Sequence, residues 1–253
     1  MRLLHADTIG LQEFPENEIP PYAILSHTWE KDEVSFQDMQ EGDPTGKEGY
    51  IKIKYACEQA LSQKLEYVWV DTCCIDKRSS SELSEVINSM FRWYRNARTC
   101  YAYLVDVPPD PSFESGKSPF RESRWFTRGW TLQELIAPRY VIFWSRDWTY
   151  LGSKGELGAI LTEITGIDDI TLRGGSLGQE SVAKRMSWAS KRVTTRKEDI
   201  AYCLLGIFGV NMPMLYGEGD KAFIRLQEEI IKETDGMLPS RSNIHLCTLF
   251  LEP

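Results

Sequence analysis

Four short runs of apolar residues, rich in β-branched and aromatic side chains, stand out along the first part of the chain. They are residues 22–26 (YAILS), 66–71 (EYVWVD), 99–105 (TCYAYLV) and 139–144 (RYVIFW). Each run is nearly continuous in its apolar character, which is typical of a strand covered on both faces, as in a parallel sheet. The pattern therefore predicts four buried, parallel strands.

Helical periodicity fills the intervals between these strands. Apolar residues recur at helical spacing over residues 53–61, before the second strand, and over residues 83–94, before the third. Ser79 and Glu82 form a candidate capping box at the start of the second helix. This alternation over residues 22–144 predicts a doubly wound α/β sheet flanked by helices. Such sheets bind their ligands beyond the carboxyl ends of the strands.

Beyond residue 150 the pattern becomes helical. One apolar face runs through residues 157–164, another through residues 200–207 after a Thr195/Glu198 capping pair, and a third through residues 223–230. Residues 107–122 contain four prolines and are expected to form a loop, whereas residues 237–253 show no clear periodicity. We therefore expect an α/β domain over residues 1–150 and a helical extension over residues 151–253 packed on it.

Polar residues cluster where the first two strands end. Ser26, His27 and Trp29 follow the first strand, and the segment DTCCID, which begins at Asp71, follows the second. The segment RGWTLQEL at residues 128–135 is predicted to form a short helix between the third and fourth strands. Because the carboxyl ends of parallel strands meet at one edge of a sheet, candidate chemistry gathers there.

Charge and cysteine usage exclude several classes of function. The net charge is −8, with 37 acidic against 29 basic residues and no dense Lys/Arg run, so nucleic acid is not an expected partner. The six cysteines show no C-x-x-C pair and the chain has only three histidines, so no metal site is expected and the thiols should be reduced. The N-terminus lacks a signal peptide, and no apolar run approaches the roughly 18 residues of a membrane span, which predicts a cytoplasmic protein.

Several motifs in a fixed order resemble a known family. YAILSHTW, YVWVDTCCID, RGWTLQELIAP and SVAKRMSWASKRVTTRKEDIAYCLLGIFGVNMPMLYGEG together resemble the fungal heterokaryon-incompatibility (HET) domain with its helical extension, up to about residue 235. The resemblance implies an innate-immunity role in programmed cell death after non-self recognition. It also implies self-association into a homo-oligomer and a sensor or NLR-type partner.

A second resemblance is to TIR domains, in which a Ser-containing loop, an acidic strand end and a W-x-x-x-E helix form the site. Here those positions are Ser26, Asp71, and Trp130 with Glu134. The resemblance implies a TIR-like (flavodoxin-like), mostly parallel sheet, with Glu134 as the catalytic carboxylate of an NAD hydrolase. NAD would be the substrate, and no separate cofactor would be required. The candidate NAD-binding residues are Ser26, His27, Trp29, Asp71, Cys74, Arg128 and Trp130.

The chemistry of NAD cleavage suits a single carboxylate. Nicotinamide is already a cationic leaving group, and its departure leaves an oxocarbenium-like ribose related to the transition state of glycoside hydrolysis. A fixed carboxylate beside the ribose can stabilise that charge. The chain departs from TIR domains in carrying Thr131 where a cysteine often follows the tryptophan, in the loop at residues 107–122, and in the helical extension. It also lacks a G-x-G-x-x-G phosphate loop.

Plainer structural roles compete with these assignments. Glu134 could be a capping or solvent-facing glutamate, Trp130 a core aromatic, Asp71 the cap of the following turn, and Arg128 a surface ion-pair partner. Two other functions also stand beside NAD cleavage. One is a non-catalytic signalling adaptor that acts by self-association. The other is a hydrolase or transferase built from Cys74 and His27, with Asp71 or Asp76 orienting the histidine.

Overall fold

A seven-stranded sheet forms the centre of the molecule. The computed structural model describes residues 1–111, 113 and 117–237. Across the sheet the strands follow the order β2-β1-β4-β3-β5-β6-β7. Their bounds are β1 (Arg2–His5), β2 (Gly10–Glu13), β3 (Tyr22–His27), β4 (Tyr67–Trp69), β5 (Thr99–Tyr103), β6 (Val141–Trp144) and β7 (Tyr150–Ser153).

The four predicted strands are confirmed as β3, β4, β5 and β6, and each pairs in parallel with its neighbours among them. The prediction of a mostly parallel sheet is wrong, because β1, β2 and β7 add three antiparallel pairings and make the sheet mixed. These three strands are only four residues long and carry polar or glycine positions, so their apolar signal is weak.

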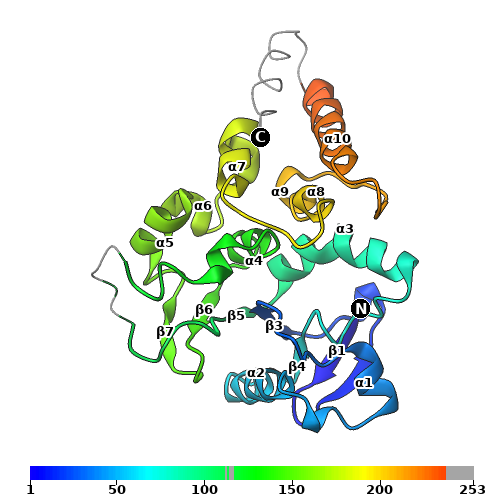
Figure 1. Cartoon of the computed structure of the whole chain (residues 1–253), viewed down its shortest axis with the longest axis vertical. Helices are drawn as coiled ribbons and strands as arrows, with labels where there is room; N and C mark the ends of the chain where they lie inside the picture. The colour runs from blue at the N-terminus through cyan, green and yellow to red at the C-terminus, as the bar shows by residue number, and fades with distance from the viewer. Residues whose placement is uncertain (112, 114–116, 238–253) are drawn as a thin grey trace.

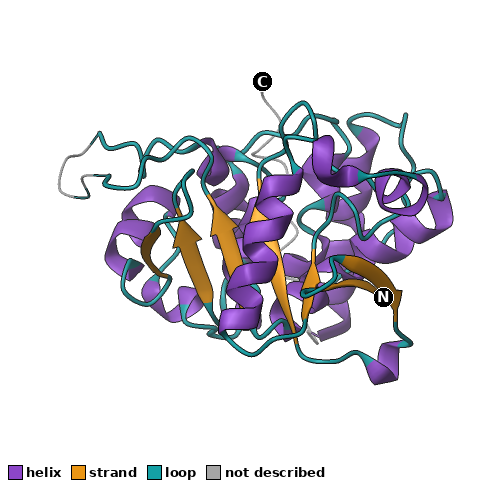
Figure 2. Ribbon diagram, turned by 90° about the horizontal axis from the view of Figure 1, so that it is seen from below, coloured by secondary structure: helices purple, strands orange, loops and turns teal. Residues whose placement is uncertain are grey.

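Helices cover both faces of the sheet. α2 (Tyr50–Ser62) lies on one face, whereas α3 (Ser80–Asn96) and α4 (Thr131–Ile136) lie on the other (Figure 1). Figure 2, seen from the side of α2, shows the strands running side by side between these layers. Shorter elements connect them: α1 (Phe36–Glu41) and the 3-10 turns η1 (Glu16–Glu18), η2 (Pro44–Gly46) and η3 (Arg124–Thr127). The α/β class is confirmed.

The helical extension continues on the side of α3 and α4 (Figure 1). It consists of α5 (Gly158–Thr165), α6 (Asp169–Leu172), η4 (Leu177–Gln179), α7 (Val182–Ala189), α8 (Asp199–Tyr202), α9 (Leu205–Phe208) and α10 (Lys221–Met237). α6 packs on α4, and α9 packs on α3. The helix expected over residues 200–207 is two short helices instead of one. Residues 238–253, which include Cys247, lie outside the described part of the chain.

The two predicted capping pairs have different outcomes. Ser79 caps α3, since its hydroxyl accepts the Glu82 N–H at 3.3 Å, but the Glu82 carboxylate binds Arg2 and the Asp76 N–H rather than the cap. The prediction of a Thr195/Glu198 capping pair is wrong. Glu198 accepts the N–H groups of Gly217 at 2.8 Å and Gly219 at 3.0 Å, because the chain folds back and brings this turn over α8.

No helix within the described residues is both long enough and apolar enough to cross a bilayer. The five cysteines placed by the structure are all buried free thiols. Burial of these thiols raises the pKa of Cys57 to about 12 and that of Cys203 to about 12. They therefore behave as packed apolar groups rather than as nucleophiles.

The contact between α9 and α3 depends on Gly206, which has no side chain. A methyl group on Gly206 would overlap the Cβ and ring of Phe91. We expect Gly206→Ala to lower the free energy of unfolding by about 1–3 kcal/mol, since overpacking outweighs the ~1 kcal/mol that alanine adds to helix stability. Chemical denaturation measures this. Gly46→Ala, whose added methyl meets open space, is the control and should change little; equal stability of both variants would contradict the packing argument.

Candidate active site at the carboxyl end of β3

The order of the parallel strands reverses at β3. From β3 the chain passes to β4 on one side and then returns to β5 on the other. β3 and β5 therefore lie next to each other at the switch point of the sheet, where their connections diverge, and Ser26 pairs in register with Ala102. This is where open α/β sheets place their ligand sites.

Successive residues of β3 point to opposite faces of the sheet, and this divides the site. Ser26 contacts Glu134 of α4 on one face, whereas His27 contacts Lys52 of α2 on the other. We call the first group the Glu134 cluster (Ser26, Tyr94, Trp125, Glu134) and the second the His27 cluster (His27, Trp29, Lys52, Asp71). The sequence predicted one group of polar residues, and the pleat of β3 separates it into two.

The Glu134 cluster is enclosed. Ser26 Oγ donates a hydrogen bond to Glu134 Oε2, and Trp125 Nε1 donates to the same Ser26 oxygen at 2.8 Å. Tyr94 lies beside the carboxylate, and its hydroxyl donates to the Leu25 carbonyl at 3.3 Å. Ser26 is completely buried, and Glu134 is only 7% exposed. The carboxylate is therefore held by Ser26, which Trp125 in turn fixes.

Burial raises the pKa of the Glu134 carboxyl to about 8. The charge of Asp71 also raises it, while the hydrogen bond from Ser26, the nearby Tyr94 hydroxyl and the charge of Arg192 lower it. A buried carboxyl with a pKa near neutrality can exchange a proton under physiological conditions. Strongly shifted groups of this kind gather at functional sites, because transition-state chemistry requires groups that ordinary surfaces do not supply.

α4 has only six residues, too few to be stable alone, so neighbouring groups must fix it. At its start, the Thr131 hydroxyl donates to the carbonyls of Trp125 and of Arg128. The guanidinium of Arg192 binds the Arg128 carbonyl and Thr131 Oγ1, each at 2.8 Å. At its end, the buried Lys154 ammonium donates to the carbonyls of Leu135, at 3.1 Å, and Pro138. Cations thus anchor both ends of the helix.

The His27 cluster is a hydrogen-bonded chain. Lys52 Nζ lies 3.0 Å from His27 Nδ1 and pairs with Glu33. Because an ammonium can only donate, Nδ1 accepts, and Nε2 carries the proton shared with Asp71 Oδ1 at 3.1 Å. Asp71 Oδ2 in turn accepts the Trp29 indole N–H at 2.9 Å. Burial raises the pKa of Asp71, but His27, Lys77 and Trp29 outweigh it and hold the pKa below its usual range.

Trp29 is the exposed end of this chain. It is 51% exposed, and the Lys77 ammonium lies 3.6 Å from its ring centroid. Such a cation–π pair positions a large aromatic ring at the surface, where it can stack on another ring. The ring also lines a small hollow of about 110 Å³ together with Thr72, Ile75 and α1 residues.

The other predicted site residues, Cys74, Arg128 and Trp130, form hydrogen bonds outside the two clusters. Cys74 is buried, and its sulfur accepts the Val70 N–H at 3.4 Å. Both ring nitrogens of His27 are engaged by Lys52 and Asp71, which gives a Cys74–His27 dyad no support. Arg128 and Trp130 bind the extension: the Arg128 guanidinium donates to Thr195 at 3.1 Å, and the Trp130 indole donates to Asp199 at 3.2 Å.

Sequence reasoning missed several residues of the site. Lys52 carried a usable signal, since it falls on the same face of α2 as the buried Ala56 and Ala60. A lysine in an otherwise apolar stripe is rarely buried unless it is paired. Trp125, Tyr94 and Arg192 carried no local signal, because their distance from Ser26 and Glu134 along the chain hides the contact.

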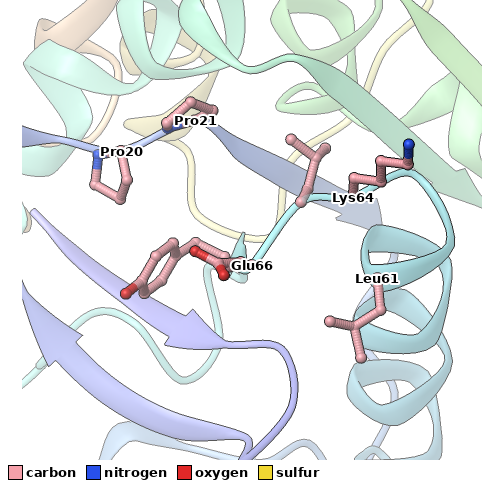
Figure 3. Close-up of a pocket in the computed structure, with 7 residues that line it drawn as sticks. Pro20, Pro21, Leu61, Lys64 and Glu66 are labelled. Atoms are coloured by element: carbon pink, nitrogen blue, oxygen red, sulfur yellow. The ribbon is translucent and has the colours of Figure 1, made fainter.

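Neither of two surface hollows formed by the described residues includes Glu134. The larger, of about 260 Å³, lies between Pro20, Pro21, the C-terminal end of α2 and Glu66 (Figure 3). It sits where β3 and β4 begin, which is the opposite edge from the usual ligand side of such a sheet. Across the described ranges, no three His, Cys, Asp or Glu side chains gather in a way that could hold a metal ion.

Comparison with known proteins relates the sequence of the chain to a family. Residues 22–118 match the family model "Heterokaryon incompatibility protein (HET)". The "Vegetative incompatibility protein HET-E-1" of Podospora anserina is 49% identical to the chain over 249 residues. Residues 22–118 therefore form a HET domain. The aligned region covers 94% of this chain but 18% of that relative's length. No solved structure matches, so the likeness of this HET domain to TIR domains stays a prediction.

Glu134 should make the stability of the protein depend on pH. Its pKa is raised from 4.5 to about 8, so between these values the folded state holds a proton that the unfolded chain releases. The free energy of unfolding should therefore fall as the pH rises through this window, with a slope of at most about 1.4 kcal/mol per pH unit. Glu134→Gln cannot ionise and should lack this part of the slope.

Urea unfolding between about pH 5.5 and about pH 7.5 measures that slope above the range in which Asp71 titrates. Glu58→Gln changes an exposed glutamate of α2 and should keep the slope of the unmodified protein. Identical slopes for the unmodified protein and Glu134→Gln would show that Glu134 ionises normally.

Proposed function

We propose that this HET domain is a fungal heterokaryon-incompatibility effector that triggers programmed cell death by cleaving NAD in the cytoplasm, with Glu134 as its catalytic carboxylate. The observation that carries the proposal is the buried Glu134 carboxylate bound to Ser26 at the switch point of the sheet. The parallel strand order β4-β3-β5-β6, which is flavodoxin-like, supports a TIR-like fold.

The properties of Glu134 suit this reaction. When the C–N bond to nicotinamide breaks, the electron pair leaves with the nicotinamide ring, and positive charge develops on the ribose. The ionised form of Glu134, which a pKa of about 8 makes the minor form at neutral pH in this closed structure, is the one that stabilises that charge, and it does so most strongly in a dry site. Ser26 and Trp125 fix the orientation of the carboxylate before substrate arrives. Trp29, held by Asp71 and Lys77, offers a ring surface at the same edge of the sheet.

Access to Glu134 requires a rearrangement. The carboxylate is nearly covered, and the hollow beside Trp29, at about 110 Å³, is smaller than the roughly 300–1,000 Å³ of typical ligand pockets. The proposal therefore includes a closed resting state, which self-association at high protein concentration opens.

The decisive experiment is an NAD-consumption assay at high protein concentration. The unmodified protein should release nicotinamide, and Glu134→Gln should reduce the rate by at least about 100-fold, because the amide carries no charge to stabilise the ribose. Glu58→Gln is the matched control and should keep full turnover. Retained turnover in Glu134→Gln would remove Glu134 from the mechanism, and no turnover in the unmodified protein would overturn NAD cleavage.

A non-catalytic adaptor that acts by self-association is the second candidate. The observation that favours it is the outer face of α10, where Ile224 and Ile231, two turns apart, are 48% and 39% exposed. Exposed aliphatic residues on one helix face are available for contact with another copy of the chain.

If assembly alone kills, the Ile224→Asp/Ile231→Asp double variant should abolish both oligomerisation and cell death in fungal cells, whereas Glu134→Gln should still kill. Light scattering and a viability count measure the two effects. Lys232→Asp, at an exposed polar position of the same helix, controls for the added charge. Loss of killing in Glu134→Gln with assembly intact would reject the adaptor.

A further inference from the structure

One segment of the extension is bound to the turn that precedes α4. Val193 N–H donates to the Thr127 carbonyl at 2.7 Å, and Gly129 N–H donates to the Val193 carbonyl at 2.9 Å, which makes a parallel bridge between the two segments. The approach is close enough that a Cβ on Gly129 would overlap the methyl group of Thr194. This turn and the segment 192–194 therefore form one unit.

Arg192 supplies the charged contact in this unit. Its side chain lies almost wholly inside the protein, at 6% exposure, and Nη1 binds both the Arg128 carbonyl and Thr131 Oγ1. Nη2 is buried and has no hydrogen-bond partner among the described residues. A buried guanidinium that is only partly bonded lowers stability, so its presence calls for an explanation beyond packing.

We propose that Arg192 is a positioning residue for Glu134, through which the C-terminal extension sets the placement and the electrostatic environment of the catalytic carboxylate. The inference rests on the proposed function where it concerns turnover. Arg192 acts through α4: it fixes the first turn, at Arg128 and Thr131, and Glu134 lies about one helical turn after Thr131. The extension is then a working part of the site rather than an attached domain.

Electrostatics supports the same assignment. Burial dominates the raised pKa of Glu134, and the positive charge of Arg192 is among the groups that lower it. Asp71 at the end of β4, Tyr94 of α3, and Cys100 of β5, whose sulfur donates to the Glu134 carbonyl, face the same residue from the other sides. Arg192 is the cation of this group, so its removal leaves the charges of Glu134 and Asp71 without that counter-charge.

The test measures both the titration of Glu134 and turnover in Arg192→Met, Arg192→Lys and the control Lys191→Met, which neutralises the adjacent exposed lysine. The carboxyl ¹³C signal of Glu134 is assigned by its absence from Glu134→Gln. In Arg192→Met we expect the titration midpoint to move upward and kcat for nicotinamide release to fall on the order of 100-fold with little change in KM, because the carboxylate is displaced.

Arg192→Lys separates charge from geometry. It keeps the positive charge, so the midpoint should stay near that of the unmodified protein, but an ammonium cannot reproduce the planar guanidinium, so kcat should still fall. If Arg192→Met does not fold, this variant carries the test. Lys191→Met should match the unmodified protein in both measurements.

The outcomes separate this inference from the proposed function. Full turnover in Arg192→Met and Arg192→Lys overturns the positioning role and leaves NAD cleavage standing. If the unmodified protein leaves NAD intact, NAD cleavage is overturned, and the titration still decides the inference: a midpoint in Arg192→Met equal to that in Lys191→Met rejects it, and an upward shift supports it.

Discussion

The burial of one carboxylate, that of Glu134, is the constraint on which the rest of the site depends. An isolated charged group inside a protein is so unfavourable that it either takes up a proton or gathers compensating groups. This domain does both. The pKa is raised toward neutrality, and Ser26, Tyr94 and the more distant Arg192 each moderate the increase. Ser26 of the sheet, Tyr94 of α3 and Arg192 of the extension therefore all act on this one carboxylate of α4.

The pleat of β3 explains why two polar clusters meet at one strand end without merging. Ser26 and His27 are neighbours in the chain but lie on opposite faces of the sheet. Ser26 contacts α4, and His27 contacts α2. Asp71 connects them, because it binds His27 and Trp29 and its charge acts on Glu134. A change on the α2 face can therefore influence the carboxylate on the α4 face through charge, without direct contact.

The central fold was accessible from the sequence because its signals are local. The four parallel strands are continuous apolar runs, and the order of strand and helix defines an α/β sheet. The antiparallel strands escaped notice because four residues with polar or glycine positions have little periodicity. Within the site, Ser26, Asp71 and Glu134 were found because each follows a strand or lies in a recognisable motif. Trp125 and Arg192 were not, since only the tertiary fold brings them to α4.

The two cations that hold α4 both come later in the chain than the helix itself. Lys154 binds the carbonyls at its end, and Arg192 binds the turn at its start. During synthesis, Glu134 leaves the ribosome well before either of these residues. A nascent or prematurely ended chain therefore has the carboxylate but lacks the anchors that orient it. Under the proposed function, this order would keep incomplete polypeptides inert until Arg192 is made.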